Sequence, residues 1–520
     1  MALTAEISRR IDARWHRITH RLREHSRRLA ERRPRTFLVL ATLAAAGGYL
    51  ALLAPALVGL VAWTRAGLAL GGGMAPTAAG VWVPVLVGAA GWALFAQLFR
   101  LEFGRPEGVR IPRAAAPELG RLVDGLCSEL HAARVHRIFV TEGAGIELVR
   151  TPVRGLPLGF RNQLLIGSAA LQCLSRDQLR ALVAGHVGEI SVHNLGIVAW
   201  LCQLRQVWIQ YRLAFARSRS LGARLYRPLF DFYAPAYARL TLPLGRDRVF
   251  RRDAYARYVT PLEDLAEALV MESVVARFLE AYYWPRVFRA AEKCPEPTFR
   301  AYGNLGIVFE RKMPHLRPQA WVREAYHRGA VDPDHPSLRM RLDALGTGEP
   351  SFPGVPEVTA LEELIGARAG RVLSELDQRW MARESENWAV RHQRHQDEHG
   401  RLAALRELAE QGELHGKRAM EYAALVKRHG TAEEAAAAYR RILEINPEDP
   451  RIQFGVGKFL LSIGDPEGVQ LLEQAMERDK HCVAAACRLI SEFVVHTGSQ
   501  ETVRHYVQQM LREQDPRRAG

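Results

Sequence analysis

Hydrophobic and polar positions divide the chain into regions with different periods. Residues 5–33 carry apolar side chains three, four or seven positions apart, with arginines between them, a pattern typical of an amphipathic helix. No charge occurs in Thr36–Thr64, and Val81–Phe99 is again uncharged and mostly apolar. A helix needs about 20 apolar residues to cross the hydrocarbon core of a bilayer. The pattern therefore predicts a basic amphipathic helix over residues 1–35 and two transmembrane helices within residues 36–100.

The region that follows, residues 101–345, alternates between helical and short extended patterns. His136–Thr141 is predicted to form a strand, and Gln163–Ser168 is a short apolar run. The next segment, Leu171–Asn194, has leucines and valines at helical spacing, and Ser175 is suited to cap the start of the helix. We expect an α-rich α+β domain here.

The C-terminal region begins with a Gly- and Pro-rich linker at 346–356, and residues 346–399 are predicted to be linker and helices. Between residues 400 and 520 a period of about 34 residues resembles that of tetratricopeptide repeats. Tyr422, Ala435, Tyr439, Asn446 and Pro447 fit the repeat spacing, and two further, weaker units follow. This pattern predicts an α-solenoid that binds protein or peptide partners.

The formal net charge of +15 is informative mainly because it is unevenly distributed along the chain. Much of the excess lies in the first 35 residues, directly before the uncharged segment, which favours membrane lipid over nucleic acid as the partner. Arginines also follow the second apolar segment, and positive flanks stay in the cytoplasm. The sequence thus predicts a multi-pass protein of the cytoplasmic (inner) membrane, with both termini and the main domains in the cytoplasm. Its six scattered cysteines form no CxxC pair and are expected to be reduced thiols.

One helix contains a conflict between pattern and residue type. Gly185, His186, Gly188 and Glu189 stand in Leu171–Asn194 where an apolar stripe should continue. Two glycines and two buried polar groups in the middle of a helix cost stability unless something compensates. Such a conflict indicates a functional site, or the remains of one.

Short phrases in a fixed order connect this helix to a family. The phrases are APEL at Ala116–Leu119, LSRDQL at Leu174–Leu179, GRDRVFRRDAYA at Gly245–Ala256 and HPSLRMRLDAL at His335–Leu345. In this order they resemble phrases of integral-membrane zinc metallopeptidases of the CAAX prenyl protease and bacterial HtpX type. The resemblance covers about residues 110–345 and implies a zincin-type, metallopeptidase-like domain.

The same resemblance implies a degenerate catalytic site. Family members carry a histidine ligand, a glutamate base and a second histidine ligand on the central helix, and a glutamate ligand on a later helix. Matching the phrases places Gly185, His186 and Glu189 at the first three positions and Val249 at the fourth. Glycine and valine offer no donor atom, so we expect no bound zinc and no peptidase activity of the family type. The matched framework residues are Arg246, Asp253, His335 and Arg341.

An alternative site remains open. His186, Glu189 and His193 are spaced i, i+3 and i+7, so on a continuous helix they would share one face. They could form a rebuilt zinc site of an active metal-dependent endopeptidase, with Asp253 or His335 as a further ligand. The histidine-rich segment 384–399 also suggests metal binding, but its composition favours a solvated helix face.

The function expected from these patterns is that of a membrane-anchored pseudoenzyme. Its metallopeptidase-like domain and C-terminal repeats would bind proteins, as an adaptor or regulator in membrane-protein quality control at the bacterial inner membrane. The quality-control role is implied by the resemblance alone. A purely structural membrane scaffold is a further alternative.

Overall fold

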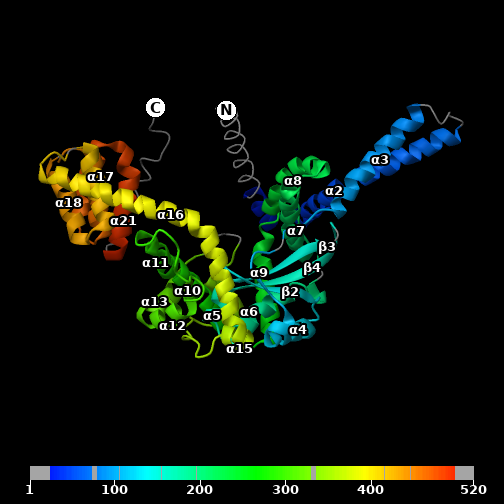
Figure 1. The fold of residues 1–520 in the computed structure, drawn as a ribbon, viewed down its shortest axis with the longest axis horizontal. Coiled ribbons are helices and arrows are strands. Elements are labelled where there is room, and N and C mark those ends of the chain that lie inside the picture. Colours follow the sequence, from blue (N-terminus) through cyan, green and yellow to red (C-terminus); the bar gives the residue numbers. More distant parts are fainter. Residues whose placement is uncertain are drawn as a thin grey trace. The chain divides into compact units, whose positions relative to one another are not determined.

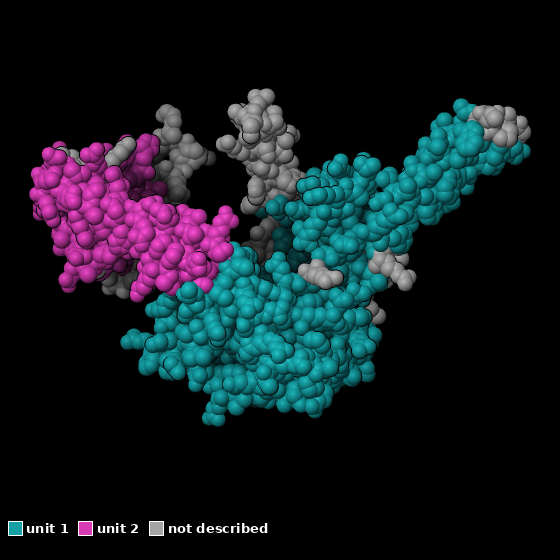
Figure 2. Space-filling model, viewed as in Figure 1, with its two compact units in different colours: residues 1–288, 298–383 teal, residues 289–297, 384–520 magenta. Residues whose placement is uncertain are grey.

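A computed structural model describes residues 24–72, 79–104, 106–153, 155–194, 196–329, 335–414, 416–445 and 447–497. Most of the predicted basic amphipathic helix, residues 1–23, lies outside these ranges. The chain divides into two compact units, which Figure 2 colours separately. The first contains residues 1–288 and 298–383, and the second contains residues 289–297 and 384–520.

The first unit contains a small mixed sheet. Its strands are β1 (Val109–Ile111), β2 (Val135–Thr141), β3 (Ile146–Val153) and β4 (Leu156–Gly167). They are arranged in the order β1-β2-β4-β3, with β2 and β4 parallel and the other pairs antiparallel. The predicted strand His136–Thr141 is present as part of β2, whereas β1, β3 and β4 were not predicted as strands. The strand β3 lies at one edge of the sheet.

Helices make up most of the rest of the first unit (Figure 1). They are α2 (Pro34–Gly71), α3 (Ala79–Phe99), α4 (Pro117–Glu129), α5 (Ser168–Cys173), α6 (Arg176–Gly188), α7 (Ile197–Arg217), α8 (Leu221–Leu240), α9 (Leu244–Val259), α10 (Leu262–Phe278), α11 (Trp284–Arg289), α12 (Leu305–Lys312), α13 (Pro318–His327), α14 (Leu338–Leu345), α15 (Ala360–Leu364) and the start of α16 (Ala369–Glu410). Short turns of other helix types in this unit are η1 (Arg113–Ala115), η2 (Val192–Asn194), η3 (Leu279–Tyr283), η5 (Met313–His315) and η6 (Gly366–Arg368), whereas η4 (Ala290–Glu292) and η7 (Lys480–Cys482) belong to the second unit. The α-rich α+β class is confirmed for the part of the chain that the structure describes.

The two long apolar segments form a helical hairpin, α2 and α3. Both helices are long and apolar enough to cross a membrane, as the sequence predicted. Small residues allow the close approach, since a Cβ atom on Gly91 would lie 2.3 Å from the carbonyl oxygen of Pro55. Away from this contact the hairpin exposes large apolar side chains, including Leu43, Leu68 and Leu86. A surface of this kind suits contact with lipid.

The first turns of α2 pack against the two long helices α7 and α8. Phe37 belongs to a buried cluster that contains Trp208 and Tyr211 of α7 and Phe230 and Tyr237 of α8. The buried hydroxyl groups have partners, because Tyr211 donates to the carbonyl oxygen of Gly155 at 2.7 Å and Tyr237 to that of Leu201 at 3.0 Å. The hairpin is therefore anchored to the first unit by an aromatic core.

The central helix begins where the sequence predicted but ends earlier. Ser175 is the N-cap of α6, and it exchanges hydrogen bonds with Gln178 in a capping box. The prediction that the helix continues to Asn194 is wrong, because α6 ends at Gly188. Beyond that point the backbone bonds to the loop after α4. Ser191 donates its hydroxyl proton to the carbonyl oxygen of Leu130 at 2.6 Å, and other bonds join Ile190 to Ala133 and Val192 to His131.

The second unit is entirely helical where it is described. It contains the end of α16, followed by α17 (Gly416–His429), α18 (Ala432–Ile445), α19 (Pro450–Ser462), α20 (Glu467–Arg478) and α21 (Val483–Thr497). Consecutive helices pack together, and a Cβ atom on Gly457 of α19 would lie 2.9 Å from the carbonyl oxygen of Gly468 on α20. The end of the predicted third repeat, from residue 498, lies outside the described residues.

Candidate functional site

A cleft of about 680 Å³ opens beside α6 in the first unit. The segment from Thr141 to Glu147, which includes the start of β3, forms part of its wall, and α9 supplies Arg248, Val249 and Arg252. Four residues predicted from the sequence line it: His186, Glu189, Val249 and His335. The sequence therefore identified residues that the fold brings together from three distant segments.

Two glycines explain how α9 comes so close to α6. A Cβ atom on Gly185 would lie 2.7 Å from Cγ of Arg252, and one on Gly188 would lie 2.3 Å from Cβ of Tyr255. Neither contact is possible for real Cβ atoms without a shift of the helices. The two glycines in the central helix therefore have a structural role, which offsets their low helix propensity.

Glu189, at the position of the second metal ligand in the resemblance, forms an ion pair. Both its carboxylate oxygens accept hydrogen bonds from Arg248, from Nε at 2.9 Å and from Nη2 at 2.7 Å. The Glu189 side chain is only 11% exposed. A bidentate guanidinium–carboxylate pair of this kind is strong and geometrically specific. It places a fixed positive charge beside the carboxylate, where a metal ion would otherwise bind.

His186, at the position of the catalytic base, contacts a second arginine. Nη1 of Arg252 lies 3.2 Å from Nε2 of His186. A guanidinium group can only donate, so Nε2 must accept and the ring proton resides on Nδ1. Burial, together with the positive charges of Arg252, Arg248 and Arg341, lowers the pKa of His186 well below its usual value. The ring is therefore neutral, and its Nδ1 atom has no hydrogen-bond partner among the described residues.

The framework residues other than His335 make contacts between helices. Arg341 of α14 donates two hydrogen bonds to Asp253 of α9, from Nε at 2.8 Å and from Nη2 at 2.7 Å. Nη1 of Arg341 also donates to Glu272 of α10 at 3.3 Å. Arg246 points Nη2 toward the sulfur of Met340 at 3.1 Å. In this chain Asp253 orients an arginine, whereas the resemblance gives it the role of orienting a histidine ligand.

His193 does not join His186 and Glu189. The prediction that these three residues share one helix face is wrong, because α6 ends at Gly188 and His193 lies in the short turn η2. His193 lines a separate pocket, where its ring centroid is 5.7 Å from that of His131. Among the described residues, metal-ligand atoms of three or more His, Cys, Asp or Glu side chains converge elsewhere, at His395, His399 and His429 of the second unit.

The comparisons with known proteins add no family to this geometry. No protein-family model matches the chain, and no curated protein matches its sequence.

The buried pair of Arg341 and Asp253 yields the first prediction. Arg341→Ala leaves a buried carboxylate without its partner, which typically costs about 3–5 kcal/mol. Arg339→Ala, on the exposed side of the same helix, is the matched control and should change stability by less than about 0.5 kcal/mol. Thermal unfolding of the full chain in detergent measures both. Equal unfolding midpoints for the two variants would contradict the structural role of the pair.

A second prediction concerns the neutral His186. The unfolded chain binds a proton on this residue near pH 6.5, and the folded chain does not, because its pKa is lowered. Stability should therefore fall as the pH drops below about 6.5, by up to about 1.4 kcal/mol per pH unit from this group. Unfolding measured between pH 5 and pH 7 should show a shallower slope for His186→Gln. The exposed His327→Gln is the control, and a slope reduced equally in both variants would refute the assignment.

Proposed function

We propose that this chain is a membrane-anchored pseudopeptidase, related to the zinc metallopeptidases of the CAAX prenyl protease and HtpX type. The observation that carries the proposal is the pairing of both remaining polar site residues with arginine. The guanidinium group of Arg248 neutralises the charge of Glu189. The guanidinium group of Arg252 donates a hydrogen bond to Nε2 of His186, so the lone pair of that atom is engaged. A cation held at each donor group opposes the approach of a second cation. Gly185 and Val249, at the other two ligand positions, have no donor atom.

The ligand that suits the cleft is an extended segment of polypeptide. The edge strand β3 contributes Ile146 and Glu147 to the wall of the cleft. A peptide can add to an exposed sheet edge through backbone hydrogen bonds, while neighbouring pockets select its side chains. Carboxylates and guanidinium groups, including Glu107, Glu142 and Arg205, line the cleft, so it carries charges of both signs. Binding without cleavage is the activity proposed for this site.

Membrane attachment is proposed to involve more than the hairpin. Leu221, Leu225, Leu229 and Phe232 are exposed at spacings of four, four and three along α8, which makes an apolar stripe. The start of α8 lies beside the end of α3, since a Cβ atom on Gly222 would be 2.7 Å from Cγ of Gln97. A stripe next to a membrane hairpin suits the bilayer interface. The arginines that flank the hairpin favour a cytoplasmic position for the two units.

The helices of the second unit supply the proposed second binding surface. α17 begins at Gly416 and α19 at Pro450, so successive helix pairs are 34 residues apart (450 − 416). This spacing supports tetratricopeptide-like repeats, which bind peptides or proteins. A non-cleaving cleft and a repeat surface on one membrane protein fit an adaptor or regulator in membrane-protein quality control. That last role rests on the resemblance.

The absence of catalysis is tested with the full chain purified in detergent. Incubated with an unfolded protein such as casein and added zinc, it should produce no cleavage that a chelator blocks. Its zinc content should be the same in wild type and in His186→Ala, because the cleft holds no metal. Chelator-sensitive cleavage that is lost in His186→Ala would overturn the pseudopeptidase proposal and support an active endopeptidase.

Peptide binding in the cleft is tested by photocrosslinking in cell membranes. A photoreactive amino acid at Glu147, which is exposed on β3, should form adducts with polypeptide. The same probe at Arg311, exposed on α12 and away from the cleft, is the matched control. We expect adducts at position 147 to exceed those at 311 and to decline when an unlabelled unfolded protein competes. Equal, non-competable labelling at both positions would favour a structural scaffold.

A further inference from the structure

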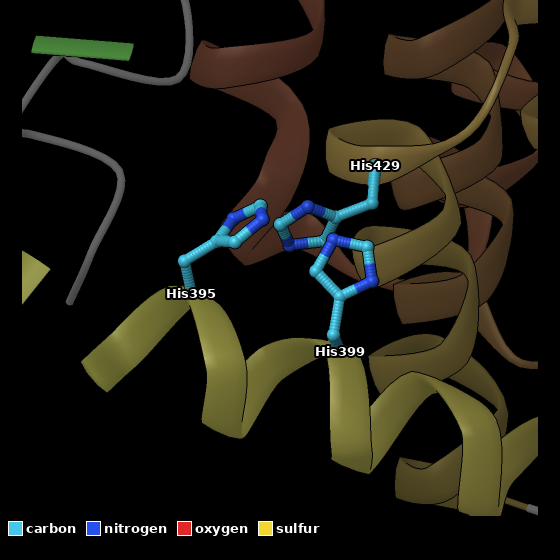
Figure 3. Close-up of side chains that lie close together, drawn as sticks. All are labelled: His395, His399 and His429. Carbon is cyan, nitrogen blue, oxygen red and sulfur yellow. The ribbon is translucent and has the colours of Figure 1, made fainter. Parts of the chain in front are cut away.

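A cluster of three histidines lies in the second unit, outside the cleft. His395 and His399 are one turn apart on α16, and His429 is the last residue of α17. Figure 3 shows the three rings turned toward one another. One ring nitrogen of each histidine lies within 4.8 Å of a ring nitrogen of each of the other two. The ring centroids are 4.4 to 5.0 Å apart.

The packing of α16 against α17 holds this arrangement in place. His395 and His399 share a face because residues four apart on a helix are neighbours. Leu402 and Leu405 of α16 are buried in one cluster with Ala419, Ala423 and Val426 of α17. Arg401 of α16 donates two hydrogen bonds to the carboxylate of Glu421 on α17, from Nε at 2.8 Å and from Nη2 at 3.0 Å. The His429 side chain is only 6% exposed, so its position is fixed by its surroundings.

The donor set determines which ion fits. Imidazole nitrogen suits zinc, copper and nickel, whereas magnesium and calcium prefer oxygen. With zinc–nitrogen bonds of about 2.0–2.1 Å, two ligands of a tetrahedral ion are about 3.4 Å apart. The ligand atoms lie within 4.8 Å of one another, and changes of rotamer at His395 and His399 would bring them to this spacing around the less exposed His429.

A carboxylate beside the cluster adds to the site. Oε2 of Glu398 lies 2.9 Å from Nε2 of His429, so the carboxylate can hold the ring in position. Arg428 binds the other oxygen of Glu398 and orients the carboxylate. This positioning role makes Glu398 a contributor to metal affinity.

We propose that His395, His399 and His429 bind one divalent transition-metal ion, with zinc as the expected ion, and that the metal ties α16 to α17. The site lies where the repeat helices begin. Because a metal that binds only the folded state stabilises it, the stability of the second unit depends on metal supply. The proposal is independent of the proposed function, since it uses none of the cleft residues.

The test uses the full chain in detergent, stripped of metal by a chelator and titrated with zinc against a fluorescent chelator of known affinity. Wild type should bind about one zinc ion per chain. His399→Ala should weaken binding by roughly 100-fold or more, and Glu398→Gln by roughly 10- to 100-fold. His399 is exposed, so its replacement does not disturb a core. The exposed His481→Ala in the same unit is the matched control and should bind zinc as wild type does.

A spectroscopic readout and a stability readout complete the test. Cobalt(II) bound to wild type should show visible absorption bands of a low-symmetry nitrogen site, and these should be lost in His399→Ala. Zinc should raise the unfolding temperature of wild type and leave that of His399→Ala unchanged. Equal zinc affinity in wild type and His399→Ala, or no saturable binding, would overturn the proposal. Zinc that is lost only in His186→Ala would do the same and would also refute the pseudopeptidase.

Discussion

The close packing of α9 on α6 is the constraint from which the chemistry of the cleft follows. Gly185 and Gly188 remove the side chains that would keep the helices apart, and Arg252 and Tyr255 occupy the space that results. Arg252 is thereby held against His186, and Arg248, one turn earlier on α9, reaches Glu189. A bulkier residue at position 185 would have to displace the arginine. The space left at Gly185 and the position of Arg252 against His186 are thus parts of one packing arrangement.

The charges in the cleft also oppose the binding of a metal ion. A zinc site of the family type needs neutral imidazole and free carboxylate to offset the charge of the ion. Here His186 is neutral, but Arg252 bonds to its Nε2 atom, and the charge of Glu189 is balanced by Arg248. The pair of Asp253 and Arg341 joins α9 to α14, a structural task that does not require a metal.

Local signals made parts of this fold and site predictable. The cap at Ser175 and the uncharged hairpin are set by residues adjacent in sequence, so both were recognised. The end of α6 at Gly188 was not, because it depends on hydrogen bonds to the distant loop at Leu130. Edge strand β3 was missed although it pairs with β4 in a local hairpin, because its segment mixes apolar residues with Glu147, Arg150 and Pro152 and shows no clear alternation. No sequence pattern indicated the roles of Arg248 and Arg252, because their hydrogen-bond partners lie about 60 residues away in the chain.

The histidine cluster shows why composition alone misassigns a surface. The segment 384–399 is charged and half exposed, so a solvated helix face was the simpler interpretation. His429 alters that interpretation, because it comes from another helix and brings a third imidazole to His395 and His399. In the cleft, by contrast, the histidine and the glutamate are each bound by arginine. Within the described residues, the arrangement of donor atoms thus favours a metal site in the second unit, where the ion would support helix packing. It does not favour a metal site in the cleft of the first unit, where the ion would activate water.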